Sequence, residues 1–260
     1  MRKSYIILIF VMTVCTSCEW KLRLDMPGLG GQVAIERYDR IEALYLTTGD
    51  FSALQQMNID YPMETRTLIE DVLKIGEVSD RNISNRFLHF FQDSTLQAIL
   101  TEVSRQFADM EDINREFSKG FSRLQREIPG IDIPKIYTQI GALDQSVIVS
   151  NNTLGICLDK YLGMDFAPYH RYYPLEQRRQ MTRSMIVPDC LHYYILSLFP
   201  LPSQTWERQQ ACDLHMARIQ WVVNKIIERK AFTGRYVDQV DRYMQSHKNT
   251  TVLELLSKTE

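Results

Sequence analysis

The chain has 260 residues, of which 45% are hydrophobic, so it has enough apolar material for a buried core and is not an intrinsically disordered protein. Thirty Lys and Arg residues oppose 32 Asp and Glu residues, and the formal net charge is −2. Because affinity for nucleic acid comes from clustered basic residues, this balance argues against a nucleic-acid partner.

The first residues have the pattern of an export signal. Arg2 and Lys3 precede an apolar run over residues 5–14, which as a helix would be about 15 Å long, roughly half the thickness of a hydrocarbon core. The run is too short to span a membrane and therefore predicts a signal peptide. Cys18 then follows a small residue, with Cys15 where Leu or Val is usual. This segment resembles the lipobox of bacterial lipoproteins, in which the cysteine is acylated.

Acylation of Cys18 would anchor the chain, since each buried methylene contributes roughly 0.8 kcal/mol and more than one acyl chain makes attachment stable. We therefore expect a lipoprotein signal peptide over residues 1–17 and a lipid-anchored cysteine with a flexible, glycine-rich tether over residues 18–32. The alternative is an ordinary signal peptide, which would leave a soluble protein. One globular domain over residues 33–260 is the simplest interpretation of the rest.

The other cysteines are Cys157, Cys190 and Cys212. Their spacing is wide and their number is odd, so they form no CxxC motif and cannot all pair. The sequence does not decide whether two of them form a disulfide, and buried free thiols are the favoured interpretation.

Helices are predicted where apolar residues recur at three- and four-residue spacing. The clearest pattern runs from Ser94 to Phe107, and Ser94 and Gln97 stand at capping-box distance. Further helices are predicted around residues 68–73 and 113–124, from Pro188 to residue 198, from Trp206 to about Lys230, and from a second capping box at Thr251 and Glu254.

The middle of the chain has a different pattern. Residues 135–140, 147–150 and 154–158 are rich in β-branched side chains, and turn-forming residues separate them. This pattern predicts a small antiparallel β-meander inside a mostly helical single domain, so the expected class is α+β.

The stretch around these strands is also distinctive as a sequence. The most specific part is residues 154–163, with residues 134–140 and 146–149 before it. Weaker parts are residues 35–39, 90–95, 165–169 and 186–189. Together they resemble the gliding-motility lipoprotein GldB family over roughly residues 33 to 200, and the similarity fades beyond about residue 202.

The resemblance implies an envelope lipoprotein associated with a gliding and secretion apparatus. It implies a lipid anchor such as palmitate on Cys18, a place in the outer membrane, and other envelope proteins as partners. The sequence contains no GxSxG, Walker A or dinucleotide-binding motif. We therefore predict a structural or interaction role with no catalytic activity and no cofactor.

The family also resembles in layout the zinc peptidases, in which a small sheet precedes a helix bearing HExxH. The corresponding residues here, 186–194, hold His192 but no second histidine at the required spacing. The motif is absent, so a metal-dependent peptidase-like enzyme lacking HExxH is kept as the alternative function.

A weak metal candidate remains. Asp189 and His192 are three residues apart and could share a helical face, and His215 or Asp159 could complete a site. The plainer interpretation is that Asp189 favours the N-terminus of its helix through the macrodipole, while His192 is a core or surface residue. The plainer interpretation is favoured, and no metal is predicted.

Two aspartates near Gly163 could act as paired acids. We favour a structural interpretation, in which Asp159 accepts backbone hydrogen bonds at the end of the meander and Asp165 caps a turn before Pro168.

An aromatic and basic stretch follows these aspartates. It consists of Tyr169, His170, Arg171, Tyr172 and Tyr173. Tyr and Arg are enriched in protein interfaces, so these five residues form a candidate interface. An irregular loop with snorkelling side chains is an equal alternative. A small-molecule receptor, with an apolar pocket beneath the meander, is a third functional hypothesis.

Overall fold

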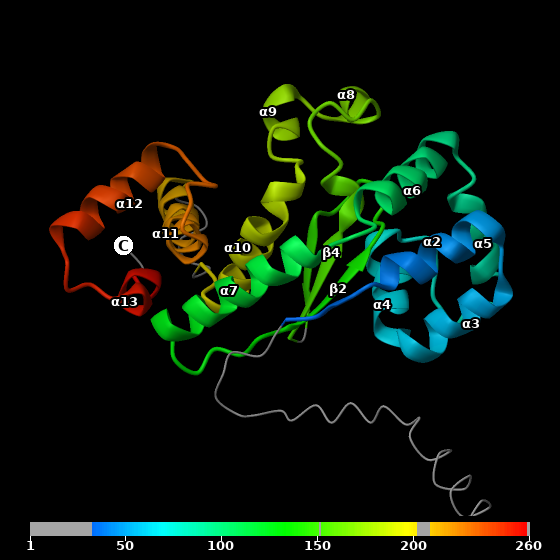
Figure 1. The fold of residues 1–260 in the computed structure, drawn as a ribbon, viewed down its shortest axis with the longest axis horizontal. Coiled ribbons are helices and arrows are strands. Elements are labelled where there is room, and N and C mark those ends of the chain that lie inside the picture. Colours follow the sequence, from blue (N-terminus) through cyan, green and yellow to red (C-terminus); the bar gives the residue numbers. More distant parts are fainter. Residues whose placement is uncertain (1–32, 151, 202–208, 259–260) are drawn as a thin grey trace, which may run out of the picture. The chain divides into compact units, whose positions relative to one another are not determined.

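The computed structural model describes residues 33–150, 152–201 and 209–258, which belong to one compact unit (Figure 1). Helices dominate and a small sheet lies among them, so the predicted α+β class is confirmed. In chain order the elements are β1 (Ile35–Glu36), α2 (Tyr38–Thr48), α3 (Phe51–Asp60), α4 (Pro62–Arg66), the π-helix η1 (Thr67–Val72), α5 (Ile83–Phe90), α6 (Ser94–Gln106), α7 (Glu111–Glu127), β2 (Lys135–Gln139), β3 (Val147–Ser150), β4 (Thr153–Cys157), the 3₁₀-helix η2 (Leu158–Lys160), α8 (Tyr169–Tyr172), α9 (Leu175–Arg178), the 3₁₀-helix η3 (Arg183–Met185), α10 (Ile186–Leu198), α11 (Gln209–Ile227), α12 (Arg235–Ser246) and α13 (Val252–Leu256). Within these ranges, none of the helices combines the length and apolar character needed to span a bilayer.

The sheet has four strands in the described part of the chain, in the order β1-β2-β4-β3. The pairs β1–β2 and β2–β4 are parallel, and β3–β4 is antiparallel. The three predicted strands therefore occur, but the predicted antiparallel meander is wrong. A meander requires β2 to pair with β3, whereas β4 lies between them. Side chains alternate with the same two-residue period in parallel and antiparallel strands, so the sequence pattern carries no information on direction.

Side chains cap the ends of several helices, and one of the two predicted capping boxes is confirmed while the other is wrong. The predicted box of α13 is confirmed, since Thr251 Oγ1 accepts from Glu254 N at 3.1 Å and a Glu254 carboxylate oxygen accepts from Thr251 N at 2.8 Å. The predicted box at Ser94 and Gln97 is wrong. Asp93 caps α6 instead, because its carboxylate lies one residue earlier and accepts from two first-turn amides.

The proline of α10 does not occupy its first position. The helix begins at Ile186, and Pro188 lies in the first turn. A proline is tolerated throughout that turn because the first amides of a helix have no carbonyl to bond within it.

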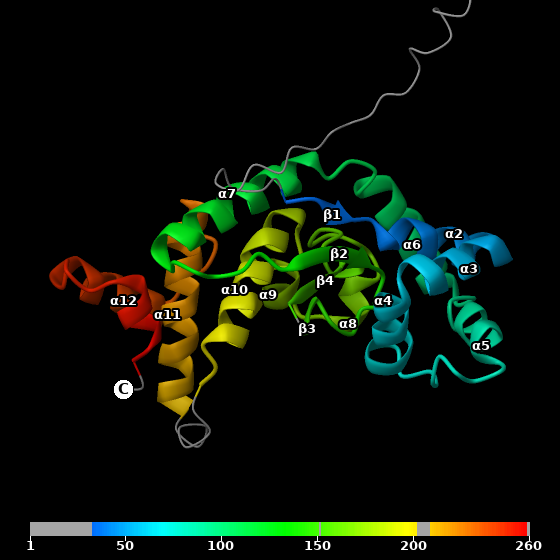
Figure 2. The same ribbon diagram turned by 90° about the horizontal axis from the view of Figure 1, so that it is seen from below.

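The helices α7, α10 and α11 pack against one another (Figure 2). Phe121 of α7 lies edge-on to Tyr194 of α10, with ring centres 5.7 Å apart. At Gly120 an added Cβ would lie 3.2 Å from Leu191 Cδ1, so the absent side chain lets the two helices approach closely. Apolar contact between helices therefore forms this side of the core.

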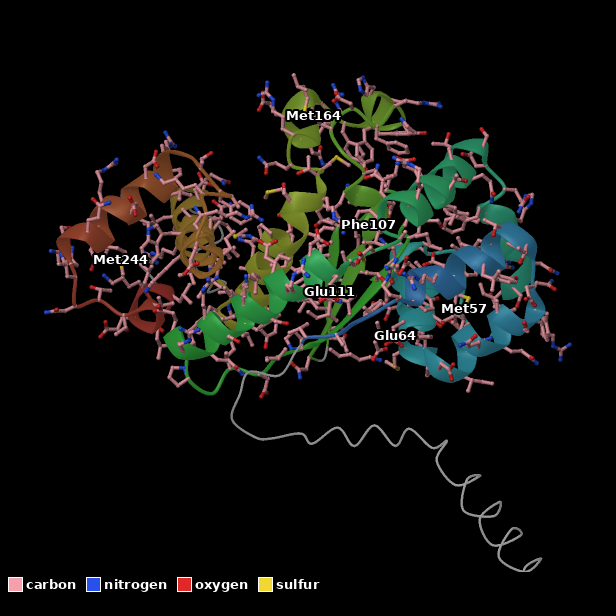
Figure 3. All side chains as sticks on the ribbon, viewed as in Figure 1. Met57, Glu64, Phe107, Glu111, Met164 and Met244 are labelled. Carbon is pink, nitrogen blue, oxygen red and sulfur yellow. The ribbon has the colours of Figure 1, made fainter. Side chains whose placement is uncertain are left out.

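On the other side, α2 packs against β2. Met57 and Glu64, labelled in Figure 3, lie on α3 and α4 and are both buried. Glu64 accepts a hydrogen bond from Lys135 Nζ at 2.8 Å, and the same ammonium lies 3.0 Å from Glu36. One lysine of β2 thus bridges α4 and the neighbouring strand β1.

Two of the cysteines are buried free thiols, as favoured from the sequence. They are Cys157 at the end of β4 and Cys190 in α10. Burial raises the pKa of both well above the ordinary value, and the charge of Asp159 raises that of Cys157 further. Both sulfurs therefore remain protonated, and neither is an activated nucleophile.

Candidate functional site

The predicted interface falls in the α8–α9 segment (residues 163–182), which connects the end of the sheet to α10 (Figure 1). Tyr169 is fully buried there. Its hydroxyl accepts a hydrogen bond from Leu162 N at 3.0 Å and donates to the carbonyl of Asp159. Tyr169 is therefore an anchor that fixes α8 to the chain leaving β4.

Tyr173 is a second anchor. Its hydroxyl donates to the carbonyl of Leu143 and accepts from Lys160 Nζ at 3.0 Å. The same ammonium lies 4.3 Å from the centre of the Tyr173 ring, which adds a cation–π contact. Both tyrosines thus hold the segment in place and are not its outer surface.

The three residues between the anchors face outward. His170 and Arg171 are exposed, and Tyr172 keeps 50% of its surface exposed. The Arg171 guanidinium lies 5.5 Å from the centre of the Tyr172 ring. Of the five predicted interface residues, these three form the accessible surface.

Two residues of this surface were missed from the sequence. Met164, labelled in Figure 3, is 37% exposed, and Leu175 is 42% exposed. They lie before α8 and at the start of the four-residue α9. Such short elements have no helical periodicity that could separate an outward apolar residue from a core residue.

The aspartates near Gly163 have opposite environments. Asp159 is fully buried, and its two oxygens accept from Gly141 N at 2.7 Å and Leu143 N at 2.5 Å, so its predicted structural role is confirmed. Asp165 is exposed on a turn. The structure therefore does not bring the two carboxyl groups together as an acid–base pair.

Asp189 of the metal candidate is held by a hydroxyl group. Its Oδ2 accepts a hydrogen bond from Tyr161 at 2.9 Å. Burial raises the pKa of Asp189 to about 7, an effect that the Tyr161 hydrogen bond opposes. This aspartate lies against the chain that leaves β4.

His192 has apolar and aromatic surroundings. It is 5% exposed, and its ring lies 5.5 Å from that of Phe232, centre to centre. Burial, with a smaller effect of His215, lowers the pKa of His192 to about 4. Its Nδ1 atom has no hydrogen-bond partner, so the imidazole is a neutral core group.

The proposed completing ligands are occupied elsewhere. His215 bonds through Nε2 to the carbonyl of Phe199 at 2.8 Å, and both oxygens of Asp159 bind backbone amides. Across the part of the chain that the structure describes, no three His, Cys, Asp or Glu side chains are placed to hold a metal ion. Neither His215 nor Asp159 therefore completes a metal site with Asp189 and His192.

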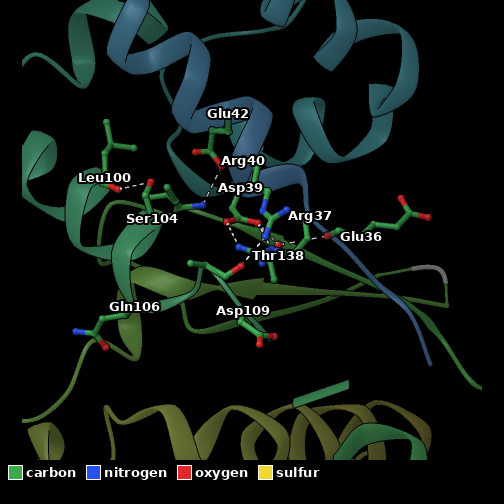
Figure 4. Close-up of polar contacts among 12 residues, drawn as sticks. Glu36, Arg37, Asp39, Arg40, Glu42, Leu100, Ser104, Gln106, Asp109 and Thr138 are labelled. Carbon is green, nitrogen blue, oxygen red and sulfur yellow. Dashed lines mark hydrogen bonds and ion pairs between the residues drawn. The ribbon is translucent and has the colours of Figure 1, made fainter. Parts of the chain in front are cut away.

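A surface groove between α2 and α6, lined by polar and apolar residues, escaped the sequence analysis. It has a volume of about 660 Å³, and its lining residues are Arg37, Asp39, Arg40, Ala43, Leu44, Thr47, Leu100, Thr101, Ser104 and Ala108. Figure 4 shows Asp39 between Arg37 and Thr138. The carboxylate receives two hydrogen bonds of 2.8 Å from Arg37 and one from the Thr138 hydroxyl. The charge of Arg37 is therefore compensated, and this pair offers no free cation to an anionic ligand.

A second buried carboxyl lies on the same helix. Glu42 is fully buried, and its Oε2 accepts from Ile140 N at 2.9 Å while Oε1 has no partner. Burial raises its pKa well above the ordinary value, which favours the neutral acid. Its partner is 98 positions away in the chain, so no local pattern could have identified the contact.

The fold and these sites define a class: a helix-rich α+β domain with a small mixed sheet and an exposed aromatic and basic segment. The chain matches the family model described as "Gliding motility protein GldB" over residues 21–212, and it belongs to this family of lipoproteins. The matched range ends inside α11, so α12 and α13 lie outside it. Comparison with curated proteins and with solved structures gives no match. Membership of a lipoprotein family associates the chain with the cell envelope.

Proposed function

We propose that this chain is a lipid-anchored, non-catalytic interaction component of the cell envelope, acylated at Cys18 and held in the outer membrane. Cys18 lies outside the described residues, and its role rests on the lipobox pattern and the lipoprotein family. The observation that carries the interaction role is the α8–α9 segment, where the buried Tyr169 and the partly buried Tyr173 fix the backbone while His170, Arg171 and Tyr172 face outward.

This arrangement suits a protein partner. Tyr and Arg provide large contact areas and are enriched among residues that dominate binding energy. The anchors Tyr169 and Tyr173 pre-organise the segment, so less conformational freedom is lost on binding. The charge of Arg171 and the ring of Tyr172 then offer one cationic and one aromatic contact side by side.

The lipid anchor is tested by metabolic labelling with a palmitate analogue. The natural chain should carry the label and sediment with membranes, and Cys18→Ala should lose both properties. Cys212→Ala is the matched control, since it changes a cysteine outside the lipobox and should keep the label. A Cys18→Ala variant that still carries the label would contradict acylation at Cys18.

The interaction surface is tested by crosslinking in cells. The double variant Arg171→Ala, Tyr172→Ala should lose the crosslinked envelope proteins that the natural chain retains. Leu253→Ala is a suitable control, because Leu253 is 46% exposed on α13, outside the α8–α9 segment. Equal crosslinking by both variants would contradict a role for this surface.

The peptidase-like alternative makes a different prediction. Stoichiometric zinc in the purified protein, lost in the double variant Asp189→Ala, His192→Ala, would favour it. We expect no bound zinc at these residues, since Asp189, His215 and Asp159 each have other hydrogen-bond partners.

A further inference from the structure

A cavity lies between α11 and α12, beside the turn that joins them. The two helices pack against each other (Figures 1 and 2), and the cavity has a volume of about 300 Å³. That volume is at the lower end of the range of small-molecule pockets, roughly 300–1,000 Å³. Its lining residues lie between 221 and 241, beyond the range that the family model matches. The family match therefore does not describe this cavity.

Two aromatic side chains form the apolar part of the cavity wall. They are Trp221 of α11 and Phe232 of the turn, and both are partly buried. Trp221 Nε1 donates a hydrogen bond to Asp241 of α12 at 2.9 Å, which fixes the orientation of the indole. The ring of Phe232 lies 5.5 Å from that of His192, centre to centre. Both rings are therefore held in place by contacts within the protein.

The turn beside the cavity is also fixed. Asn224 Nδ2 donates to Phe232 O at 2.7 Å, and Asn224 Oδ1 accepts from Phe232 N at 2.9 Å. Glu228 ends α11 with a φ of +57°, a value that is uncommon for a residue other than glycine. Arg123 of α7 holds this residue, because its guanidinium pairs with the Glu228 carboxylate and donates to Ile226 O at 3.0 Å. A preformed wall loses little conformational freedom when a ligand binds.

The charges of the cavity wall are balanced. Lys225 Nζ lies 2.8 Å from Glu127 and 5.9 Å from the centre of the Trp221 ring. The Arg229 guanidinium lies 2.9 Å from Glu116. Three basic and three acidic side chains line the cavity, and they are Lys225, Arg229, Lys230, Glu228, Asp238 and Asp241. Because their formal charges cancel, the wall favours neither an anionic nor a cationic ligand.

Three polar side chains at the rim of the cavity are available to a ligand. Within the described part of the chain, the side chains of Lys230, Thr233 and Asp238 form no hydrogen bond or ion pair, and all three residues are exposed. Ion pairs at exposed positions contribute little, so Lys230 and Asp238 would not select a zwitterion. A hydroxyl group suits both, because it accepts from an ammonium and donates to a carboxylate.

We propose that this cavity binds a neutral sugar unit. The C–H groups of the sugar ring contact Trp221 and Phe232, and its hydroxyls bond to Lys230, Thr233 and Asp238. A purely apolar ligand is disfavoured, because it would take water from these polar groups without replacing its hydrogen bonds. The inference rests on α11, α12 and their turn, and it depends neither on the lipid anchor nor on the surface of α8.

The test uses the full chain in a detergent without a sugar head group. The probes are glucose, galactose, mannose and N-acetylglucosamine, each as the free sugar and as its methyl glycoside, and binding is measured by saturation-transfer NMR. We expect at least one to bind saturably, with a dissociation constant of the order of 1 mM. Tighter binding of the glycoside supports the proposal with a glycan end as the source, and tighter binding of the free sugar supports it with a soluble sugar.

The decisive variant is Asp238→Ala, because the side chain is exposed and its loss breaks no described contact. It should weaken the binding of the sugar by about fivefold or more. Asp165→Ala is the matched control, since it removes an exposed aspartate outside the cavity and should bind within about twofold of the natural chain. Trp221→Ala should weaken binding by about fivefold or more through loss of the aromatic contact.

Three results would overturn the proposal. The first is that none of the eight probes binds the natural chain at concentrations up to about 50 mM. The second is that Asp238→Ala binds the sugar as tightly as the natural chain does. The third is that glucuronate or glucosamine, the charged relatives of glucose, binds about tenfold more tightly than glucose, because the cavity would then select a charge.

Discussion

The region around the sheet and the C-terminal helices bury polar side chains in different ways. Around the sheet, the described buried acids are Asp39, Glu42, Glu64 and Asp159, and each is bonded to a group from a distant part of the chain. In α11 to α13, the described buried polar side chains are His215 and Arg218, and the other polar contacts, such as that of Trp221 Nε1 with Asp241 at 2.9 Å, are only partly buried. Buried acids with distant partners fix the first region, whereas apolar contact, a helix cap and partly buried hydrogen bonds fix the second. We therefore expect larger and more pH-dependent effects of substitution around the sheet.

The largest effect is expected at Asp159. Asp159→Ala would leave the buried amides of Gly141 and Leu143 without acceptors. Each such loss costs about 1–3 kcal/mol, so the free energy of unfolding should fall by roughly 2–6 kcal/mol. Urea denaturation measures it. The matched change Asp165→Ala, on an exposed turn, should alter stability by less than about 0.5 kcal/mol. Equal effects of the two changes would break the comparison.

The next effect concerns pH. Asp189 has a pKa of about 7 in the folded chain against an ordinary 3.8, so the folded state holds its proton more tightly. The stability that this proton contributes is complete below pH 3.8 and is lost as the pH rises towards 7. Asp189→Asn should remove that loss, so its stability relative to the natural chain should improve as the pH rises. Thermal unfolding at several pH values measures it, and a constant difference would contradict the burial of Asp189.

The effect of pH on the contribution of His192 to stability has the opposite sign. Its pKa is about 4 in the folded chain against an ordinary 6.5, so the unfolded state binds the proton more tightly. Its contribution to stability therefore grows as the pH rises from about 4 to 6.5. In His192→Phe this rise should disappear, measured by the same thermal series. A slope identical to that of the natural chain would show that the imidazole is accessible.

A smaller effect is expected at Gly155 of β4. An added Cβ would lie 2.6 Å from the ring of Tyr137, so Gly155→Ala should overpack the sheet and cost about 1–3 kcal/mol. The control is Gly120→Ala in α7, where the new methyl meets the flexible end of Leu191 at 3.2 Å and the gain in helix propensity offsets the contact. Denaturant midpoints should separate the two variants clearly.

The smallest effect is expected in the C-terminal helices. Thr251→Ala removes the cap of α13 and should cost about 1 kcal/mol. Hydrogen exchange should increase in α13 and remain unchanged in the sheet. Glu254→Gln should cost less, because a glutamine can complete the same box. Faster exchange throughout the sheet would show that the two regions are more tightly coupled than their contacts indicate.

Part of the candidate site could be predicted from the sequence. The stretch from Tyr169 to Tyr173 stands out because aromatic and basic residues cluster there. Which of them face outward could not be read from it. Tyr169 and Tyr173 are inward because their hydroxyls reach carbonyls of the strand connections, and α8 is too short for a periodic pattern. The outward positions of Met164 and Leu175 could not be predicted for the same reason, because the elements beside them are too short for a periodic pattern.

The sequence by itself determined the class, the main helices, the positions of three strands and the family, because apolar periodicity, capping residues and characteristic stretches are local properties of the chain. Only the tertiary structure decided the strand order, the parallel pairing and the partners of Glu42 and Asp159. Strand direction leaves no trace in a two-residue alternation. The burial of a carboxyl is likewise set by residues far away in the chain, which fold over it and supply its hydrogen bonds.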